Sequence, residues 1–378
     1  MSAVRSLIAS RLDDVVEDLA MLVDAETPST HPLLLSRGAA ELVPWVKERW
    51  RCESATTLGD GPGAVIQVDV PGSLPGTVVL LGHLDTVFDA GTLARRPFSV
   101  RDGIARGPGV FDMKAGLVQG VHAVAALDEL GVPRPSVRLL VNADEEVGSL
   151  GSRSFLVSAA AGASAVLVLE PGGVAGTVKT ARKGVGLWTV TATGVAAHAG
   201  LDPEAGASAV HALAALTTHL VGSAHPSLGT TVNVGVFSGG TRPNVVADHA
   251  RLEIDVRART EAEASRVGEV LTSWRPDDDR VRVEVAGGWN RPPWSEPAPE
   301  LVARARALVA SLGVAFDPRE VGGASDGNIL AAAGLPVLDG LGASGGGAHA
   351  EHEHVVVGDL PVRVALLAGL IAGSPSAP

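Results

Sequence analysis

The first half of the chain alternates short apolar runs with amphipathic helical patterns. Four runs rich in β-branched and aliphatic residues predict strands; they span residues 64–68, 77–81, 137–141 and 165–169. Helical patterns at residues 115–130 and 151–161 lie between them. The last three runs are almost continuously apolar, which is typical of strands covered on both faces. This alternation predicts an α/β sheet of mainly parallel strands.

The pattern changes near Gly184. Two helices beside a mostly antiparallel sheet are predicted from there on, and they would form a separate α+β domain of ordinary size. The predicted strands span residues 187–193, 230–237, 250–257 and 280–285, and the predicted helices span 207–220 and 261–274.

A stretch rich in Gly and Pro, residues 287–293, predicts the linker that returns from this domain. After it, a helix at 299–312, a strand at 335–338 and a helix at 361–371 resume the first pattern. We therefore expect a discontinuous catalytic domain with a second domain inserted into it. The catalytic segments are residues 1–183 and 290–378, and the inserted domain is residues 184–289.

Composition narrows the possible partners and chemistry. The 378 residues include 30 Lys and Arg against 42 Asp and Glu, a formal net charge of −12. We expect no nucleic-acid partner and no anionic membrane surface, because phosphate binding needs a basic face. The lone Cys52 excludes an internal disulfide and a thiolate metal cluster. Because the chain has no Tyr, polar chemistry falls to His, carboxylates, Ser/Thr, Lys/Arg or a metal.

The N-terminal segment does not predict an export signal. Residues 1–22 carry apolar side chains at helical spacing, turn acidic at Asp13 and lack a continuous apolar core. We expect a single amphipathic helix there. The longest apolar run, residues 155–169, is short for a bilayer and contains polar positions. We therefore expect a cytoplasmic protein.

Acidic and histidine residues gather where predicted strands end or loops begin. In a parallel sheet the ligand crevice lies outside the carboxyl ends of the strands, so such residues are candidates for chemistry. Each also has a structural interpretation: the His of an HxD pair can be a surface or core histidine, an Asp before a helix can be an N-cap, and an acidic run can be a solvated turn. The residues are His83, Asp85, Asp112, Glu145, Glu146 and Glu170.

Three histidines lie within six residues near the C-terminus: His349, His352 and His354. They suggest a metal, although a polar loop fits them as well. With no thiol ligands and no HExxH motif, nitrogen and oxygen ligands at sheet ends suit zinc, cobalt or manganese. Two such ions would have to share one carboxylate, because the ligands do not otherwise fill two four-coordinate sites.

Eight motifs read GHLDTVF, GPGVFDMKAG, NADEEVGSLGSR, LEPGG, GVAAHAG, GGTRPNVV, GGASDGN and DGLGASGGGAH. In this order they resemble a di-zinc family that includes glutamate carboxypeptidases, aminoacylases, acetylornithine deacetylase and succinyl-diaminopimelate desuccinylase. The resemblance covers about residues 5–370 and is greatest to the glutamate carboxypeptidase branch. It implies a catalytic α/β domain, an inserted lid that dimerises, and therefore a homodimer.

The resemblance also implies a set of metal ligands. Asp112 would bridge two divalent ions, most commonly zinc, with cobalt or manganese as alternatives. His83 and Glu170 would complete one site, and Glu146 and His349 the other. The chemical competitors of His349 are His352 and His354.

Three further residues receive catalytic roles from the resemblance. Glu145 would be the general base that takes a proton from the attacking water and delivers it to the leaving nitrogen. Asp85 would orient His83. His198 of the lid would reach the active site of the partner subunit and stabilise the developing oxyanion, where an imidazole donor suits a chain without Tyr.

Substrate contacts are implied at four more positions. Asn244 and Arg257 match positions that hold the substrate carboxylate, Arg257 through a bidentate fork, with Arg259 as its rival. The loop at Gly323 would approach substrate through its backbone, and Lys183 would assist as a point charge. A tight turn and a solvated lysine are the structural alternatives for these two.

We therefore expect metal-dependent hydrolysis of the amide that joins an acyl group or a peptide to an amino acid with a free carboxylate. An N-acyl amino acid deacylase of the same family is the alternative. From other classes, Ser325 formally fits a G-x-S-x-G elbow, with Asp339 and His349 following in hydrolase order. The segment before it, residues 316–320, is too polar for the buried strand of an elbow. The last alternative is a metal-binding protein without catalysis.

Overall fold

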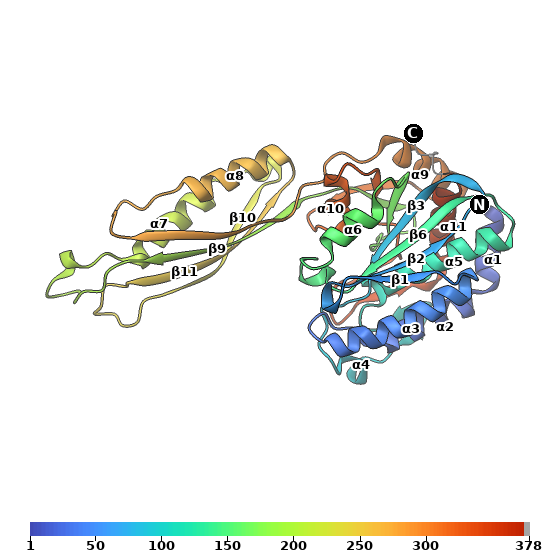
Figure 1. The fold of residues 1–378 in the computed structure, drawn as a ribbon, viewed down its shortest axis with the longest axis horizontal. Helices are drawn as coiled ribbons and strands as arrows, with labels where there is room; N and C mark the ends of the chain where they lie inside the picture. Colours follow the sequence, from blue (N-terminus) through green and yellow to red (C-terminus); the bar gives the residue numbers. More distant parts are fainter. Residues whose placement is uncertain (374–378) are drawn as a thin grey trace. The chain divides into compact units, whose positions relative to one another are not determined.

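In the computed structural model of the chain, which describes residues 1–373, the four apolar runs of the first half lie in a six-stranded sheet (Figure 1). Its strands are β1 (Ala55–Leu58), β2 (Val65–Val70), β3 (Leu74–His83), β6 (Pro135–Asn142), β7 (Ala165–Val168) and β14 (Val337–Leu338). They lie in the order β1-β2-β6-β3-β7-β14, and the last four pair in parallel. The predicted α/β sheet of mainly parallel strands is confirmed.

The helices of this part of the chain are α1 (Ser2–Ser10), α2 (Leu12–Asp24), α3 (Pro32–Trp50), α4 (Thr92–Arg95), α5 (Ala115–Glu129), α6 (Arg153–Ala160), α9 (Pro299–Ser311), α10 (Asp326–Ala332) and α11 (Leu360–Ala372). Of these, α3, α5, α9, α10 and α11 contact strands of the sheet, and most of the helices share one hydrophobic core with it. α5 packs against α11, and both are buried along almost their whole length. α10 contacts β7 and β14.

The predicted opening helix is wrong in one respect: the segment forms two helices, α1 and α2, separated at Arg11. Arg11 leaves helical geometry at φ −122° and ψ 27°. Its guanidinium donates two hydrogen bonds, of 2.6 and 2.7 Å, to Glu129 at the end of α5. The apolar spacing runs on through the break because both helices bury one face in the same core.

Two smaller sheets stand beside the main one. β4 (Ser99–Arg101), β5 (Ile104–Arg106), β15 (Gly345–Gly346) and β16 (His354–Val356) form an antiparallel sheet in the order β15-β16-β5-β4. β8 (Thr177–Arg182) pairs with β13 (Asp317–Val321). The first of these sheets brings the C-terminal histidine segment beside the residues that precede Asp112.

The chain divides into two compact units. The first comprises Met1–Ala181, Glu296–Glu320 and the chain from Ser325 onward; the second comprises Arg182–Ser295 and Val321–Ala324. Residues 374–378, the end of the expected second catalytic segment, lie outside the described residues. No helix within residues 1–373 is long and apolar enough to cross a membrane.

The second unit has the α+β composition expected from its sequence pattern. Its strands are β9 (Gly184–Thr193), β10 (Thr231–Gly239), β11 (His249–Ala258) and β12 (Arg282–Arg291), and its helices are α7 (Ala209–Gly222) and α8 (Glu261–Ser273). The strands pair antiparallel in the order β10-β11-β9-β12. Their alternate apolar side chains form a core of their own with the two helices.

The linker prediction for residues 287–293 is wrong for its first part, because β12 continues to Arg291. Gly287 pairs with Trp188 of β9. At Gly287 φ is +105°, and a Cβ there would lie 2.2 Å from the carbonyl oxygen of Leu187. The glycine therefore permits a close approach of two strands and does not mark a loop.

Candidate metal centre

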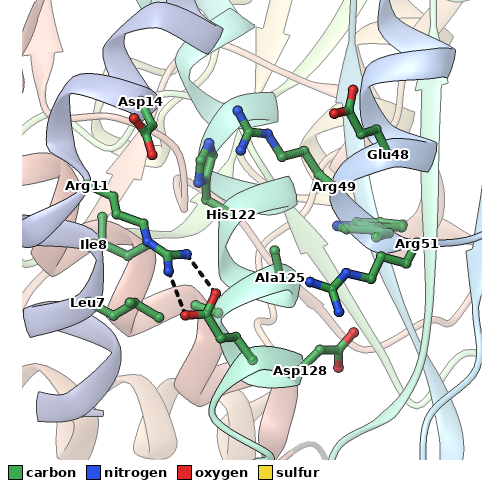
Figure 2. A pocket seen from close by; sticks show the side chains of 13 residues that line it. Leu7, Ile8, Arg11, Asp14, Glu48, Arg49, Arg51, His122, Ala125 and Asp128 are labelled. Carbon is green, nitrogen blue, oxygen red and sulfur yellow. Dashed lines mark hydrogen bonds and ion pairs between the residues drawn. The ribbon is translucent and has the colours of Figure 1, made fainter.

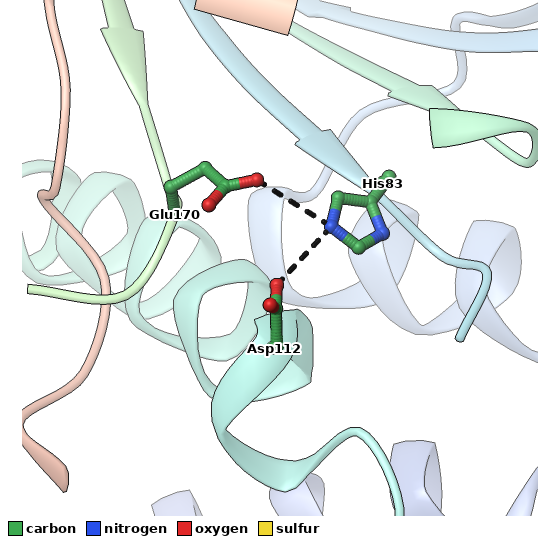
Figure 3. Close-up of side chains that lie close together, drawn as sticks. All are labelled: His83, Asp112 and Glu170. Carbon is green, nitrogen blue, oxygen red and sulfur yellow. Dashed lines mark ion pairs between the residues drawn. The ribbon is translucent and has the colours of Figure 1, made fainter. Parts of the chain in front are cut away.

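Three side chains meet at the carboxyl ends of two neighbouring parallel strands. Leu81 of β3 pairs with Val168 of β7, so the same register brings His83 and Glu170 opposite each other two residues later. His83 Nε2 lies 3.6 Å from Glu170 Oε1 and 3.4 Å from Oδ1 of Asp112 (Figure 3). We call His83, Asp112 and Glu170 the buried group, because the His83 side chain is only 2% exposed.

A second group of three shares Asp112 with the first. His349 Nε2 lies 3.3 Å from Asp112 Oδ2 and 3.2 Å from Glu146 Oε2. Glu146 lies in the turn η3 (Glu145–Val147) after β6, and His349 lies between β15 and β16 at φ +63°. We call Asp112, Glu146 and His349 the exposed group, because the His349 side chain is 53% exposed.

The donor atoms of both groups fit divalent cations. Tetrahedral ligands with bonds of about 2.0–2.2 Å lie about 3.3–3.6 Å from one another, and the four distances above run from 3.2 to 3.6 Å. Three buried atoms in the groups have no hydrogen-bond partner: His83 Nε2, Asp112 Oδ1 and Glu146 Oε1. Buried polar atoms without partners are costly. Each group would therefore hold one ion, with Asp112 common to both.

The side chains of the site shift one another's pKa values. Asp112 and Glu146 raise the pKa of His349 to about 10, against the effect of burial. Burial disfavours the charged form of His83, but the surrounding carboxylates outweigh it and raise its pKa. Burial likewise opposes ionisation of Asp112, yet the two imidazoles lower its pKa. Without a metal, the raised pKa values favour protonated His83 and His349. These protons would have to leave when a cation binds, because histidine ligates metals in its neutral form.

Asp85 contacts more than the residue it was expected to orient. Its Oδ1 lies 3.4 Å from His83 Nδ1, and its backbone oxygen lies closer, at 3.0 Å. The same carboxylate accepts the backbone N–H groups of Glu145 and Glu146, at 3.2 and 3.1 Å, and the hydroxyl of Ser29 at 2.8 Å. Asp85 therefore ties the orientation of His83 to the position of the η3 turn.

A buried polar network that sequence reasoning missed lies under the same turn. Asp326 at the start of α10 accepts hydrogen bonds from Ser149 Oγ at 2.5 Å and from Asn142 Nδ2 at 2.8 Å. Asp144 Oδ2 accepts the N–H groups of Gly151 and Ser152. The sequence signals were an Asp in GGASDGN and an Asn closing a strand, neither of which indicates a partner. The network anchors both ends of the turn that carries Glu145 and Glu146.

Glu353 was also missed as a participant. Its side chain is fully buried and contacts the backbone beside Asp112. Its place four residues after His349 was the only signal. The competing histidines lie in neither ligand group: His352 is exposed, and His354 Nδ1 lies 3.0 Å from the backbone oxygen of His352.

Ser325 caps a helix and is not placed as a nucleophile. It is fully buried, and its hydroxyl donates to Asp339 Oδ2 at 2.6 Å. The hydroxyl oxygen of Ser325 accepts the N–H of Gly327, and Asn328 completes a capping box at the start of α10. The strand before it, β13, is largely exposed, unlike the strand of a nucleophile elbow.

The remaining expected residues lie in the second unit. His198 Nδ1 accepts the N–H groups of Gly200 and Leu201, both at 3.1 Å, so the ring hydrogen is on Nε2. Asn244 lies beside the segment that follows His198, since the backbone carbonyl oxygen of Asn244 accepts the N–H of Ala199 at 3.0 Å. Arg257 forms a two-bond fork with Asp255 on the same strand, both bonds at 2.8 Å.

The loop at Gly323 is held by a residue that the sequence did not single out. Arg182 is buried and donates through Nη1 to the carbonyl oxygens of Gly323 and Ala324, at 3.2 and 3.4 Å. The neighbouring Lys183 joins this loop through its backbone N–H, which donates to the carbonyl oxygen of Val321 at 3.1 Å.

A pocket of about 430 Å³ lies among α1, α2, α3 and α5 and shares no residue with the two ligand groups (Figure 2). Three of the side chains on its wall, Arg11, Arg49 and His122, contact carboxylates. Asp18 accepts a hydrogen bond from Arg49 at 2.8 Å and lies 2.7 Å from His122 Nε2, and Arg11 pairs with Glu129. These pairs hold the first three helices to α5.

Comparisons with known proteins agree with the chemistry of the ligand groups. Residues 79–373 match Peptidase family M20/M25/M40. Carboxypeptidase G2 from Pseudomonas sp. (strain RS-16) is 32% identical over 330 residues, covering 83% of this chain and 79% of the relative. Acetylornithine deacetylase from Pasteurella multocida is 27% identical over 245 residues, 61% of this chain and 60% of the relative.

Solved structures share the fold. A tripeptidase from Staphylococcus aureus superposes with a TM-score of 0.78 at 21% identity, covering 96% of this chain and 98% of that one. The aminopeptidase PepT from Bacillus cereus gives a TM-score of 0.76 at the same identity and coverage. The family match covers most of the chain and sets aside the serine-hydrolase and non-catalytic alternatives. The chain belongs to peptidase family M20/M25/M40 and is a metallohydrolase.

Proposed function

We propose that the protein hydrolyses the amide bond between an acyl or peptidyl group and an amino acid with a free carboxylate, as a glutamate carboxypeptidase-like enzyme. The observation that carries the proposal is the sharing of Asp112 by two ligand groups, one of which contains the direct neighbour of Glu145. The likeness to carboxypeptidase G2 supports the carboxypeptidase assignment. Zinc is the proposed metal, with cobalt and manganese as alternatives that the same ligands accept.

Glu145 is the proposed general base. Two bound cations would polarise both a water molecule and the scissile carbonyl. Asp85 accepts the backbone N–H groups of both Glu145 and Glu146 and so fixes the turn that carries the two adjacent carboxylates. Glu146 belongs to a ligand group, whereas Glu145 takes a proton from the attacking water and passes it to the leaving nitrogen.

His198 is the proposed donor to the developing oxyanion, acting in the site of the partner subunit of a homodimer. Its two accepted hydrogen bonds leave Nε2–H as the donor that this role requires. The exposed edge strand β10, with exposed Val236 and Phe237, supports an association through the second unit. Mixed dimers of His198→Ala with Glu145→Ala should regain activity, because one composite site is whole. No regain would contradict the cross-subunit role.

The proposed carboxylate-binding residues are Asn244 and Arg257. Arg257 is already paired with Asp255, so a substrate carboxylate would have to compete for the fork. Arg259, two residues further along the chain, is the alternative. Each arginine is replaced by Lys in a separate variant. KM should rise in the variant that loses the arginine that binds the substrate carboxylate, because Lys cannot form the two-bond fork. Gly323 and Lys183 are proposed as secondary substrate contacts, and a cytoplasmic location remains part of the proposal.

The decisive experiment combines metal analysis with a hydrolysis screen of C-terminal-Glu dipeptides and N-acyl amino acids. Glu145→Ala should keep both metal equivalents and lose about 100- to 10,000-fold in kcat, the range expected for a general base. Glu351→Ala, an exposed carboxylate two residues after His349, is the matched control and should turn over normally. Substantial kcat in Glu145→Ala would refute the assignment.

A deacylase is the second candidate, favoured by the likeness to acetylornithine deacetylase. Both candidates share the bond type and the proposed residues. They differ in whether the group attached to the nitrogen of the amino acid is peptidyl or a simple acyl group. Turnover of N-acetyl amino acids without turnover of the dipeptides would select the deacylase. EDTA should abolish either activity.

A further inference from the structure

Glu353 lies immediately before β16 and is completely buried. Its Oε2 accepts the N–H of Gly109 at 2.9 Å, and its Oε1 accepts the N–H groups of Phe111 and Asp112, each at 2.9 Å. All three donors belong to the segment that carries the shared ligand. The three N–H donors favour the ionised carboxylate, against burial, which raises the pKa of Glu353 to about 7, and hydrogen bonds to an ionised acceptor are about twice as strong as neutral ones. Glu353 is therefore a strong attachment point for that segment.

The fold explains how the side chain reaches this backbone. β16 pairs antiparallel with β5, with His354 opposite Arg106. Glu353 consequently lies beside the chain that leaves β5 and turns toward Asp112. His349 is four residues earlier, so a single short segment supplies one ligand and holds the backbone of another.

The held segment has little else to fix it in regular structure. Gly109 adopts φ +73°, a conformation that glycine enters freely and other residues avoid. Asp112 has non-helical dihedral angles of φ −116° and ψ 94° inside the turn η2 (Val110–Lys114). Without the Glu353 carboxylate, three backbone N–H groups beside a buried side chain would lose their acceptor.

On the basis of the two-metal site proposed above, we propose that Glu353 is a positioning residue that sets the affinity of both metal sites through the backbone of Asp112. It belongs to neither ligand group, and both of its oxygens accept backbone N–H groups. The proposal predicts that loss of Glu353 has a different effect on metal binding from loss of the ligand His349 or Glu170. Loss of either of those ligands affects the ion of its own group, whereas loss of Glu353 affects both ions.

The test measures metal binding directly on the purified full-length protein. The apo-protein is titrated with Zn²⁺ in competition with a chromophoric chelator, and with Co²⁺ by its visible absorption. Glu353→Gln should weaken both equivalents about 10- to 100-fold, the range of outer-shell partners of metal ligands. Glu351→Gln, the exposed neighbour, is the matched control and should bind as the unchanged protein does. His349→Ala should weaken one equivalent only.

The outcomes distinguish this proposal from the proposed function. If the unchanged protein binds fewer than two equivalents, the two-metal function fails. If it binds two and Glu353→Gln binds both with unchanged affinity, or loses only one, the positioning role is overturned.

A second variant covers the case in which Glu353→Gln does not fold. Glu353→Asp keeps the charge but shortens the reach, and it should weaken both equivalents less than Gln does. At saturating Zn²⁺ its kcat should recover while KM stays unchanged, which a general loss of structure would not produce. Unchanged affinity in Glu353→Asp overturns the proposal. Unfolding of both variants, in zinc as well as in chelator, also overturns it by assigning Glu353 to fold stability alone.

Discussion

The buried and the exposed ligand groups share Asp112, but the fold carries their other members differently. His83 and Glu170 follow two paired parallel strands, so the register of one sheet fixes their separation. Glu146 and His349 come from a one-turn helix and a hairpin loop, which no shared ladder connects. The buried group is therefore positioned by the central sheet, and the exposed group by side chains that hold loops.

The loops of the exposed group depend on buried carboxylates that lie in neither ligand group. Asp85 and Asp326 support the η3 turn, and Glu353 supports the segment of Asp112. Each accepts at least two hydrogen bonds from groups that would otherwise be unsatisfied in the interior. A loop site can thus be as well ordered as a sheet site when charged acceptors satisfy its backbone.

The largest expected effect follows from the residue that both groups share. Asp112→Asn should abolish tight binding of both equivalents, with a loss beyond the roughly 100-fold limit of outer-shell changes. Metal analysis after dialysis against a weak chelator measures this. Asp102→Asn is the control, because Asp102 is exposed and Asn tolerates its φ of +52°. Retention of one full equivalent in Asp112→Asn would show that the two groups are independent.

The next comparison separates the two groups by their histidines. His83→Ala and His349→Ala should each lose one equivalent. His83→Ala should lower the free energy of unfolding in chelator by about 1–3 kcal/mol, because it empties a buried position. His349→Ala should lower it less, because that side chain is half exposed, although its loss removes the cationic partner of Asp112 and Glu146. Thermal and denaturant unfolding measure the difference, and equal destabilisation would contradict the assignment of one group to the core.

A smaller effect is expected where a carboxylate only supports a loop. Asp326→Asn replaces an ionised acceptor of two hydrogen bonds by an amide, which should cost about 1.5–3 kcal/mol of unfolding free energy. Both metal equivalents should remain, and kcat should fall more than KM changes, since Glu145 lies on the supported turn. Asp102→Asn again serves as control. Weaker binding of the ion of the exposed group would mean that the disturbance also reaches Glu146 on the same turn, whereas unchanged kcat would contradict the supporting role.

The smallest effect needs no substitution. A weak chelator should remove one equivalent before the other, because an exposed histidine gives access to its ion and a buried one does not. Removal of the chelator after increasing times, followed by metal analysis, resolves a fast and a slow phase of metal loss. The His349→Ala protein should show the slow phase alone. A fast phase that persists in that variant would reverse the order of the two sites.

The core strands and several site residues were predictable because their signals are local. Apolar runs of strand length end directly at His83 and Glu170, and parallel sheets collect such ends at one edge. The break at Arg11 and the extent of β12 were not predictable. At the first, Arg11 pairs with Glu129, which is 118 residues away in sequence, and the second rests on contact of Gly287 with another strand.

The choice among the three C-terminal histidines shows the same limit. Residue type alone does not separate His349, His352 and His354; the GGGAH motif selects His349, and the β16–β5 pairing brings its loop to Asp112. Their neighbour Glu353 looks like one more polar residue in a loop, yet it is turned inward. Tertiary partners, more than 200 residues away in sequence, give it its role.

The sequence by itself determined that apolar strands end in candidate nitrogen and oxygen ligands, that a thiolate cluster is excluded, and that a second unit interrupts the first. Periodicity and composition are enough for these conclusions, because burial and ligand chemistry follow from residue type. Only the tertiary structure decided that Asp112 is common to two groups and that Asp85, Asp326 and Glu353 hold them. Those facts depend on which backbone N–H groups and which strand ends the chain brings together, and long-range packing sets that.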